Sequence, residues 1–291
     1  MKFNQVLIIY KKPSQLRNAS DAKGLEYLKE TFPKLFKQTL YQQETHLNTI
    51  KQVKNILESL NIKYNVIIRN DLFTDISDFK NSTDLLITIG GDGTILSTSH
   101  VAEGIPILGV NSLPNFSRGF FCLTTPINFK KHLTEIIQGK RKPINLPLLE
   151  ASINNKTIPY PALNDVLFTN KSSAETVQYI LMVGDKAEQQ RGSGIWISAG
   201  PGSTAAILSA GGKKMSIFSE KLQFFARELC VAPGKRYLLK KGIISSLKSI
   251  KIISETSNGM VYLDGKNPPF ALQRGACLNV KISPDKLKIF L

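Results

Sequence analysis

The chain has few cysteines and no long apolar run, and both shortages limit what it can be. Only three of its 291 residues are cysteines, Cys122, Cys230 and Cys277, and they lie far apart. An odd number at these spacings excludes a disulfide framework and a zinc knuckle. The apolar run Val6–Tyr10 is too short for a signal peptide, and no run is long enough to span a bilayer. We therefore expect a cytoplasmic protein with no membrane partner, and an organelle stays open.

Histidines and acidic residues are also scarce. The three histidines, His46, His100 and His132, have no metal-ligand spacing and no neighbouring nucleophile, so we assign them no catalytic role and expect no metal-ligating side chain. Acidic residues number 22 against 38 lysines and arginines, and the net charge of +16 favours anionic partners. The basic residues form short clusters without an aromatic-lined groove, which makes nucleic acid a minor hypothesis. We expect no nucleic-acid partner and favour small phosphorylated molecules.

Strand-like and helix-like segments alternate in the first half of the chain. Short apolar runs predict strands at 6–10, 63–68, 84–89 and 105–110, and helical spacing predicts helices at 44–60, after Thr94 and within 126–139. This alternation indicates an α/β domain with a Rossmann-like parallel sheet over residues 1–142. After Pro143, short apolar runs are separated by turn signals, which indicates a β-rich domain over residues 143–272.

The stretch from residue 84 to 94, DLLITIGGDGT, combines a buried strand with a glycine loop. The apolar run Leu85–Ile89 leads into Gly90–Thr94, where backbone N–H groups can turn toward a phosphate and Thr94 can cap a following helix. Asp92 is anomalous there, since phosphates repel a carboxylate unless it helps to hold a metal ion or removes a proton. The stretch therefore points to phosphoryl transfer. The alternative is that Asp92 and Gly93 form an ordinary hairpin turn.

Two later motifs suit a nucleoside. Asn164 and Asp165 precede an apolar run, and an amide beside a carboxylate can bind vicinal sugar hydroxyls, although a simple turn or strand entry is the alternative. The run Ile195–Ile197 leads into Gly200–Thr204, whose small residues let a flat base and its ribose approach the backbone. The alternative for this second motif is a tight loop that packs two domains together.

Taken together, these motifs resemble the NAD kinase family. GGDGT at Gly90–Thr94, the pair Asn164–Asp165 and GSTAAILSAGG at Gly202–Gly212 occur in the family's order and at similar separations. The resemblance extends from about Ile8 to the end of the chain. Further motifs are most like the mitochondrial and plant NADH-kinase branch: VNSLP at 110–114, FC at 121–122 and RGSG at 191–194. GGDGT alone is shared with lipid kinases and phosphofructokinase-like proteins, whereas the three motifs together are specific.

The resemblance implies an activity and an assembly. The family transfers the γ-phosphoryl group of ATP to the adenosine-ribose 2′-hydroxyl of NAD or NADH, with Mg²⁺ or another divalent cation neutralising charge. It implies a homodimer or homotetramer, and a last segment, residues 273–291, that returns to the first domain.

The resemblance also implies a role for each matching residue. Asp92 would be the catalytic base for the 2′-hydroxyl. The implied binding residues fall into three groups: the phosphate loop, Gly90, Gly91, Gly93 and Thr94; the ribose-binding pair, Asn164 and Asp165; and the dinucleotide contacts, Phe120, Thr204, Ala205 and Ser209.

Two departures from the family pattern bear on the acceptor. Ala206 stands where many members have an aromatic residue, and Ser193 stands where many have an acidic residue, which leaves the choice between NAD and NADH open. Two other functions are kept as alternatives: a lipid kinase acting on diacylglycerol or sphingosine, and a non-catalytic dinucleotide-binding protein.

Overall fold

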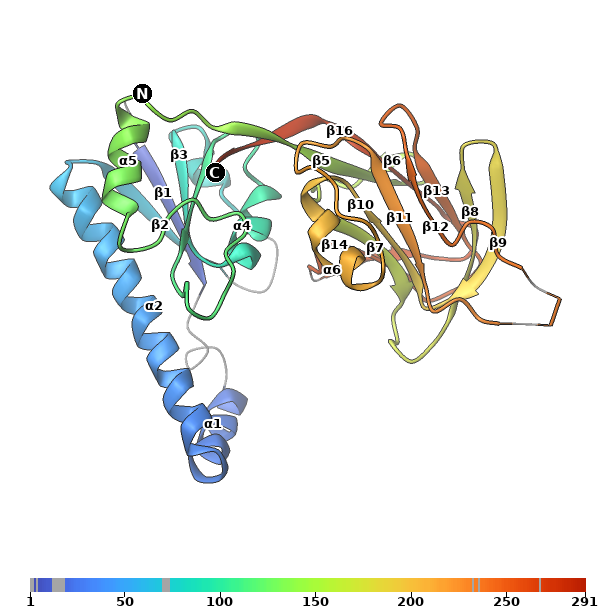
Figure 1. Cartoon of the computed structure of the whole chain (residues 1–291), viewed down its shortest axis with the longest axis horizontal. Helices are drawn as coiled ribbons and strands as arrows, with labels where there is room; N and C mark the ends of the chain where they lie inside the picture. The colour runs from blue at the N-terminus through green and yellow to red at the C-terminus, as the bar shows by residue number, and fades with distance from the viewer. Residues whose placement is uncertain are drawn as a thin grey trace. The chain divides into compact units, whose positions relative to one another are not determined.

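The chain divides into two compact units. The computed structural model describes residues 3, 5–11, 19–69, 74–231, 233–234, 236–266 and 268–291. Unit 1 consists of residues 1–144 and 288–291, and unit 2 of residues 145–287. Figure 1 shows that unit 1 mixes helices with strands and that unit 2 is made almost entirely of strands. The segment expected to return to the first domain began at residue 273, whereas only residues 288–291 belong to unit 1.

Unit 1 is built on a parallel sheet. Its described elements are β1 (Gln5–Lys11), α1 (Ala19–Thr31), α2 (Pro33–Ser59), β2 (Lys63–Arg69), α3 (Ser77–Lys80), β3 (Leu85–Gly90), α4 (Asp92–Ser99), β4 (Ile107–Asn111) and α5 (Phe129–Ile137). The strand order is β2-β1-β3-β4, every pair is parallel, and the last residues of β16 (Cys277–Phe290) pair with β4. The predicted α/β class is therefore confirmed.

The helices of unit 1 bury apolar stripes against this sheet. On α2 the buried residues Ile50, Val53 and Leu57 recur at helical spacing and join the core. The buried side chains of α5 join the same core. All predicted strands and helices of this unit are present, but α2 is much longer than the predicted 44–60. Because the strands are parallel, β1, β3 and β4 end at one edge, where ligands bind in sheets of this kind.

Unit 2 is a β-sandwich. Its described elements are β5 (Ile144–Ile153), β6 (Lys156–Thr157), β7 (Asp165–Asn170), β8 (Val177–Val183), β9 (Lys186–Gly192), β10 (Gly194–Ser198), a 3₁₀ turn (Pro201–Thr204), α6 (Ala206–Ser209), β11 (Leu222–Arg227), β12 (Lys241–Ile244), β13 (Ile250–Ser254), β14 (Gly259–Leu263), β15 (Phe270–Leu272) and β16. One antiparallel sheet has the order β12-β11-β10-β7-β14-β15, and the other contains β16, β13, β8 and β9. Their inner faces share one core, in which the Phe168 and Tyr179 rings meet edge to face.

Turn residues separate strands of unit 2, in line with the turn signals that follow Pro143 in the sequence. Asn154, Asn155, Gly184, Asp264 and Gly265 all have positive φ, as tight turns between antiparallel strands require. The predicted β-rich second part of the chain is therefore confirmed.

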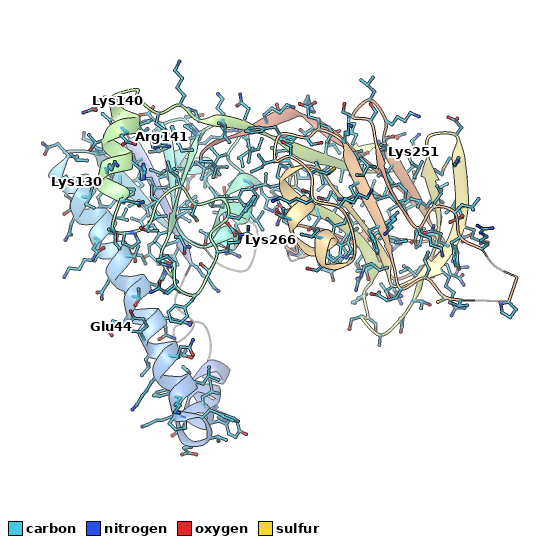
Figure 2. All side chains as sticks on the ribbon, in the orientation of Figure 1. Glu44, Lys130, Lys140, Arg141, Lys251 and Lys266 are labelled. Carbon is cyan, nitrogen blue, oxygen red and sulfur yellow. The ribbon has the colours of Figure 1, made fainter. Side chains whose placement is uncertain are left out.

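Basic side chains cover parts of the surface. Lys130 and Lys140 are exposed on α5 and the turn that follows it, and Arg141 beside them pairs with Glu135 at 3.2 Å (Figure 2). These positive charges therefore face solvent rather than the core. Among the described helices, none combines the length and the apolar character needed to cross a membrane.

Candidate functional site

The glycine loop joins β3 to α4 at the carboxyl edge of the parallel sheet. All six residues of β3 are buried, and α4 begins at Asp92 with Gly91 at its N-cap. The hairpin alternative for Asp92 and Gly93 is therefore wrong. Thr94 is not the cap either, because Gly91 occupies that position without a side-chain hydrogen bond. Instead Thr94 is buried beneath the loop, and a Cβ on Gly90 would overlap its hydroxyl. Glycine at position 90 thus allows this close approach.

Asp92 is held in place by the loop that follows β4. Its two carboxylate oxygens accept hydrogen bonds from the backbone N–H groups of Phe120, at 2.9 Å, and Phe121, at 2.8 Å. Each oxygen keeps a further lone pair that can accept a ligand's hydroxyl. The carboxylate is therefore fixed beside the glycine loop before any ligand arrives.

The loop from residue 111 to 122 is partly site and partly core. Phe121 is buried and Phe116 is 42% exposed, so the loop contributes one aromatic ring to the core and presents another at the surface. Phe120 is half-buried, with the Arg118 guanidinium 5.6 Å from its ring centre. Burial, and secondarily the Asp92 charge, raise the pKa of Cys122 to about 12, so this thiol stays protonated and is a poor nucleophile.

The same loop is organised by Asn111, a role that the sequence analysis missed. The Asn111 amide donates to the Ser117 carbonyl at 3.0 Å, and its oxygen accepts from the Leu113 N–H and the Ser117 hydroxyl at 3.1 and 2.9 Å. An Asn that bonds the backbone two residues on is typical of a turn. The Asn and Pro residues at 111–115 are the local sequence signal that indicates such a turn.

A cavity of about 240 Å³ lies beside the glycine loop in unit 1. Its lining includes Gly90, Gly91 and Ser112, together with His46 from α2. The His46 ring is buried, with Nδ1 2.8 Å from the Ser112 hydroxyl and Nε2 3.0 Å from the Lys11 carbonyl. Sequence reasoning gave His46 no role, because a buried histidine on a helix has no distinguishing local pattern.

In unit 2 the pair Asn164 and Asp165 lies at the start of β7, as the strand-entry interpretation expects. One carboxylate, that of Asp264, accepts the backbone N–H groups of Leu163, Asn164 and Asp165 at 2.9, 2.7 and 3.0 Å. Asp264 itself has a φ of 51°, and its N–H donates to the Asp165 carbonyl at 3.0 Å. In the sequence, Asp264 before Gly265 is a pattern that indicates only a turn, whereas the structure shows that its carboxylate fixes the backbone of the pair.

Asp165 is a buried carboxyl beside another carboxylate. Burial, and secondarily the charge of Asp264, raise its pKa to about 8. At neutral pH the Asp165 carboxyl is therefore largely protonated and can donate a hydrogen bond as well as accept one.

The glycine-rich loop after β10 packs directly against Asn164. The Ser198 hydroxyl donates to the Asn164 carbonyl at 2.8 Å, and a Cβ on Gly202 would overlap that carbonyl oxygen. The structure thus brings the second and third motifs together. Beside them, Thr204 and Ala205 are half-buried, whereas Ser209 is exposed at the end of α6.

The predicted site residues are divided between the units. The residues in unit 1 are Gly90, Gly91, Asp92, Gly93, Thr94 and Phe120, and those in unit 2 are Asn164, Asp165, Thr204, Ala205 and Ser209. Within the described part of the chain, no group of three or more His, Cys, Asp or Glu side chains could hold a metal ion. A cation at the glycine loop would therefore need most of its ligands from a bound nucleotide or from water rather than from protein side chains.

Known proteins resemble this chain in sequence. Residues 22–141 match the ATP-NAD kinase N-terminal domain. A probable NADH kinase from Oryza sativa subsp. japonica is 31% identical over 268 residues, which cover 84% of this chain and 81% of the rice protein. An NADH kinase from Arabidopsis thaliana is 29% identical over 279 residues, covering 85% and 84% of the two chains.

Solved structures share the fold. An NAD kinase from Archaeoglobus fulgidus, in complex with ATP, has a TM-score of 0.70 at 18% identity, covering 99% of this chain and 93% of the other. Yeast NADH kinase complexed with NADH has a TM-score of 0.68 at 20% identity, with coverage of 99% and 84%. From the sequence matches, with which the fold agrees, we conclude that the chain belongs to the NAD kinase family.

Proposed function

We propose that this protein transfers the γ-phosphoryl group of ATP to the adenosine-ribose 2′-hydroxyl of NAD or NADH, forming NADP or NADPH. The observation that carries this proposal is the fixed Asp92 carboxylate beside a glycine loop at the carboxyl edge of a parallel sheet. The sequence relatives are named NADH kinases and NAD kinases, and the two structural neighbours hold ATP and NADH. These ligands are the two substrates that the reaction needs.

In this mechanism Asp92 accepts the proton of the attacking hydroxyl. The hydrogen bonds from Phe120 and Phe121 orient the carboxylate, so no rotation is needed at the moment of attack. The glycine loop, Gly90, Gly91, Gly93 and Thr94, holds the phosphates, and the positive end of the α4 dipole stabilises charge on the transferring group. The Thr94 N–H itself donates to the Gly91 carbonyl at 2.9 Å, so Thr94 contributes by fixing the shape of the loop.

The acceptor is held mainly by residues of unit 2. Asn164 and Asp165 bind the ribose hydroxyls, and the protonated Asp165 carboxyl can donate to one of them. Thr204, Ala205 and Ser209 contact the dinucleotide along the loop that packs on Asn164. Phe120 flanks the adenine, with Arg118 on its ring. Small residues around Gly202 allow the base and ribose to lie close to the backbone.

The residues at the glycine loop fit a magnesium ion carried by the nucleotide. Mg²⁺ keeps several waters and is usually bound through substrate phosphates and one or two carboxylates. Asp92 is a carboxylate at this loop with lone pairs still available. The bound ion would neutralise charge on the phosphates, while the chain's own residues orient the two substrates.

Three further properties belong to the same proposal. The α/β domain, residues 1–142, carries the phosphate loop, and the β-rich domain, residues 143–272, carries the dinucleotide contacts. The last segment, residues 273–291, returns to the first domain at its end, residues 288–291. The protein acts in the cytoplasm, as a homodimer or homotetramer. Size-exclusion chromatography with light scattering would test the assembly.

One assay tests the proposed function. Purified protein is incubated with Mg-ATP and either NAD or NADH, and NADP and NADPH are measured separately. Formation of either product supports the proposal, and the ratio of the two rates gives the acceptor preference that Ser193 leaves open. Phosphorylation of diacylglycerol or sphingosine without dinucleotide turnover would favour a lipid kinase. Dinucleotide binding without any turnover would favour a non-catalytic binding protein.

A further inference from the structure

His46 connects the ends of the three strands that meet at the glycine loop. Its Nε2 lies 3.0 Å from the carbonyl of Lys11, where β1 ends, and its Nδ1 lies 2.8 Å from the hydroxyl of Ser112, just after β4. The Ser112 N–H in turn donates to the carbonyl of Gly90, the last residue of β3, at 3.1 Å. A single buried side chain of α2 is thus bonded to the frame of the cavity.

These contacts determine which ring nitrogen carries the proton. A carbonyl oxygen can only accept, so the hydrogen of the neutral imidazole lies on Nε2, facing Lys11. The Nδ1 atom is then an acceptor, and the single hydroxyl hydrogen of Ser112 is donated to it. In this state the Ser112 hydroxyl oxygen presents only lone pairs to the cavity. These lone pairs would repel an anionic oxygen of a ligand.

Protonation of His46 reverses the direction of this hydrogen bond. With hydrogens on both ring nitrogens, Nδ1 donates to the Ser112 oxygen, and the hydroxyl hydrogen becomes available to a ligand. The ring also gains a positive charge at the cavity wall. An anion is therefore bound better by the protonated form, and the anion in turn stabilises that form.

We infer that the cavity receives the anionic phosphates of the donor nucleotide, and that their binding drives uptake of one solvent proton by His46 and turns the Ser112 hydroxyl toward a phosphate oxygen. This inference rests on the proposed function. His46 is a positioning residue here, since it acts on the ligand through Ser112. The chemistry required of the ligand is a phosphate group, which the neighbouring Gly90 and Gly91 also suit.

The surroundings of His46 are consistent with this exchange. Burial lowers the pKa of His46, so the ring is neutral at pH 7 before the ligand binds. The Tyr10 ring of β1 lies 6.4 Å from the His46 ring, and Lys11 at the end of β1 lines the cavity. The nearest charged groups along the other elements are Glu44 on α2, Asp92 on α4 and Arg118 in the loop after β4. Glu44 is exposed (Figure 2), and the carboxylate of Asp92 accepts two backbone N–H groups.

The direct test measures the pKa of His46 by NMR, with and without ligand. The chain has three histidines, so the His46→Gln spectrum assigns the His46 signal. The ligand is the magnesium complex of the β,γ-methylene analogue of ATP, which cannot transfer its terminal phosphate. We expect the His46 pKa to rise by about one unit or more on binding. An unchanged pKa at saturation, or no binding of the analogue, would overturn the inference.

Kinetics provide a second test that does not depend on the spectrum. In wild type the KM for ATP should rise with pH between the free-state and the bound-state pKa of His46, by up to about tenfold per unit, and level off above the bound-state pKa, while the KM for the dinucleotide does not follow it. His46→Gln and His46→Asn should both lose this dependence, and either one is sufficient if the other fails to fold. His132→Gln, the same change on α5 beside Glu135, should keep it.

Failure of the inference and failure of the proposed function give different results. If His46→Gln kept the pH dependence of wild type while NADP or NADPH still formed, the inference would be wrong and the function would stand. If no dinucleotide were phosphorylated, the function would be wrong, whatever the analogue did to His46.

Discussion

Gly202 lies so close to Asn164 that no side chain fits between them. A Cβ at position 202 would overlap the Asn164 carbonyl oxygen and lie 2.5 Å from the Asn164 Cα. Both neighbours are backbone atoms, so neither can move aside as a side-chain tip could. The loop after β10 and the predicted ribose-binding pair therefore depend on each other.

This contact predicts a severe effect of Gly202→Ala. The added methyl group must push β7 and the 3₁₀ turn apart, at a cost of more than about 3 kcal/mol of unfolding free energy. We also expect dinucleotide affinity to fall, because Asn164 moves. Urea unfolding and fluorescence titration with NADH measure the two effects. Gly24→Ala is the control: nothing lies within 4 Å of its added Cβ, and the change should stabilise α1 by about 0.5–1 kcal/mol. Equal results for the two variants would contradict the prediction.

The comparison of sequence with structure shows where local patterns suffice. The buried face of α2 was predictable because Ile50, Val53 and Leu57 recur at helical spacing. Its first three turns were not, because exposed residues there form no continuous apolar stripe. The Gly90–Thr94 motif was predictable because a strand, a glycine loop and a helix follow each other directly in the chain.

Residues whose roles depend on distant partners were not predictable in this way. His46 meets Ser112 across 66 positions of sequence, and Asp264 meets Asn164 across 100. Neither residue of such a pair changes the sequence pattern around the other. The spacing of residues along the chain therefore cannot reveal these contacts. The packing of the fold creates both contacts.

Asp92→Asn should nearly abolish turnover. Loss of the base predicts a rate lower by about 10²–10⁴-fold, while dinucleotide binding is largely kept. The structure adds a second effect. The Asp92 carboxylate accepts hydrogen bonds from the N–H groups of Phe120 and Phe121, and the amide NH₂ of the variant would face one of these donors without being able to accept. A loss of about 1–3 kcal/mol in stability should accompany the kinetic effect. Steady-state kinetics and thermal unfolding measure the two.

Asp84→Asn is the matched control for Asp92→Asn. The Asp84 carboxylate also accepts a backbone N–H, that of Gln5 at 3.1 Å, but it precedes β3 and lies at the opposite end of the strand from the glycine loop. Turnover should therefore stay close to that of wild type. Full activity of Asp92→Asn would show that another group accepts the proton.

The buried carboxyl of Asp165 predicts a pH-dependent stability. Its pKa rises from the ordinary value of 3.8 to about 8 on folding, so between these values the folded chain holds a proton that the unfolded chain releases. The unfolding free energy therefore decreases as the pH rises through this window. Asp165→Asn removes the titration, so its stability relative to wild type should increase with pH, by up to about 1.4 kcal/mol per unit. Urea unfolding at pH 5, 6 and 7 measures this slope.

Asp185→Asn separates this effect from a general effect of removing charge. Asp185 is exposed in the turn between β8 and β9, so its stability difference from wild type should not vary over the same pH range. A constant difference for Asp165→Asn as well would mean that Asp165 is ionised in the folded protein.

Asp264→Asn should weaken the predicted ribose-binding pair without touching the catalytic base. The amide can still accept from Asn164 and Asp165 through its oxygen, but its NH₂ then faces the N–H of Leu163. We expect a loss of about 1.5–3 kcal/mol in stability, since bonds to a charged acceptor are lost. The KM for the dinucleotide should increase several-fold while kcat stays near that of wild type, because Asp92 and its contacts lie in unit 1.

The same substitution should also change the titration of its neighbour. The Asp264 charge is the second cause of the raised Asp165 pKa, so its removal lowers that pKa while burial still keeps it above the ordinary value. The unfolding free energy should therefore stop decreasing at a lower pH than in wild type, because the folded-state pKa of Asp165 sets the upper end of this pH range. Asp185→Asn again provides the exposed control, measured by the same urea titrations and kinetics. If Asp264→Asn lowered kcat and left the dinucleotide KM unchanged, Asp264 would not act through the ribose-binding pair.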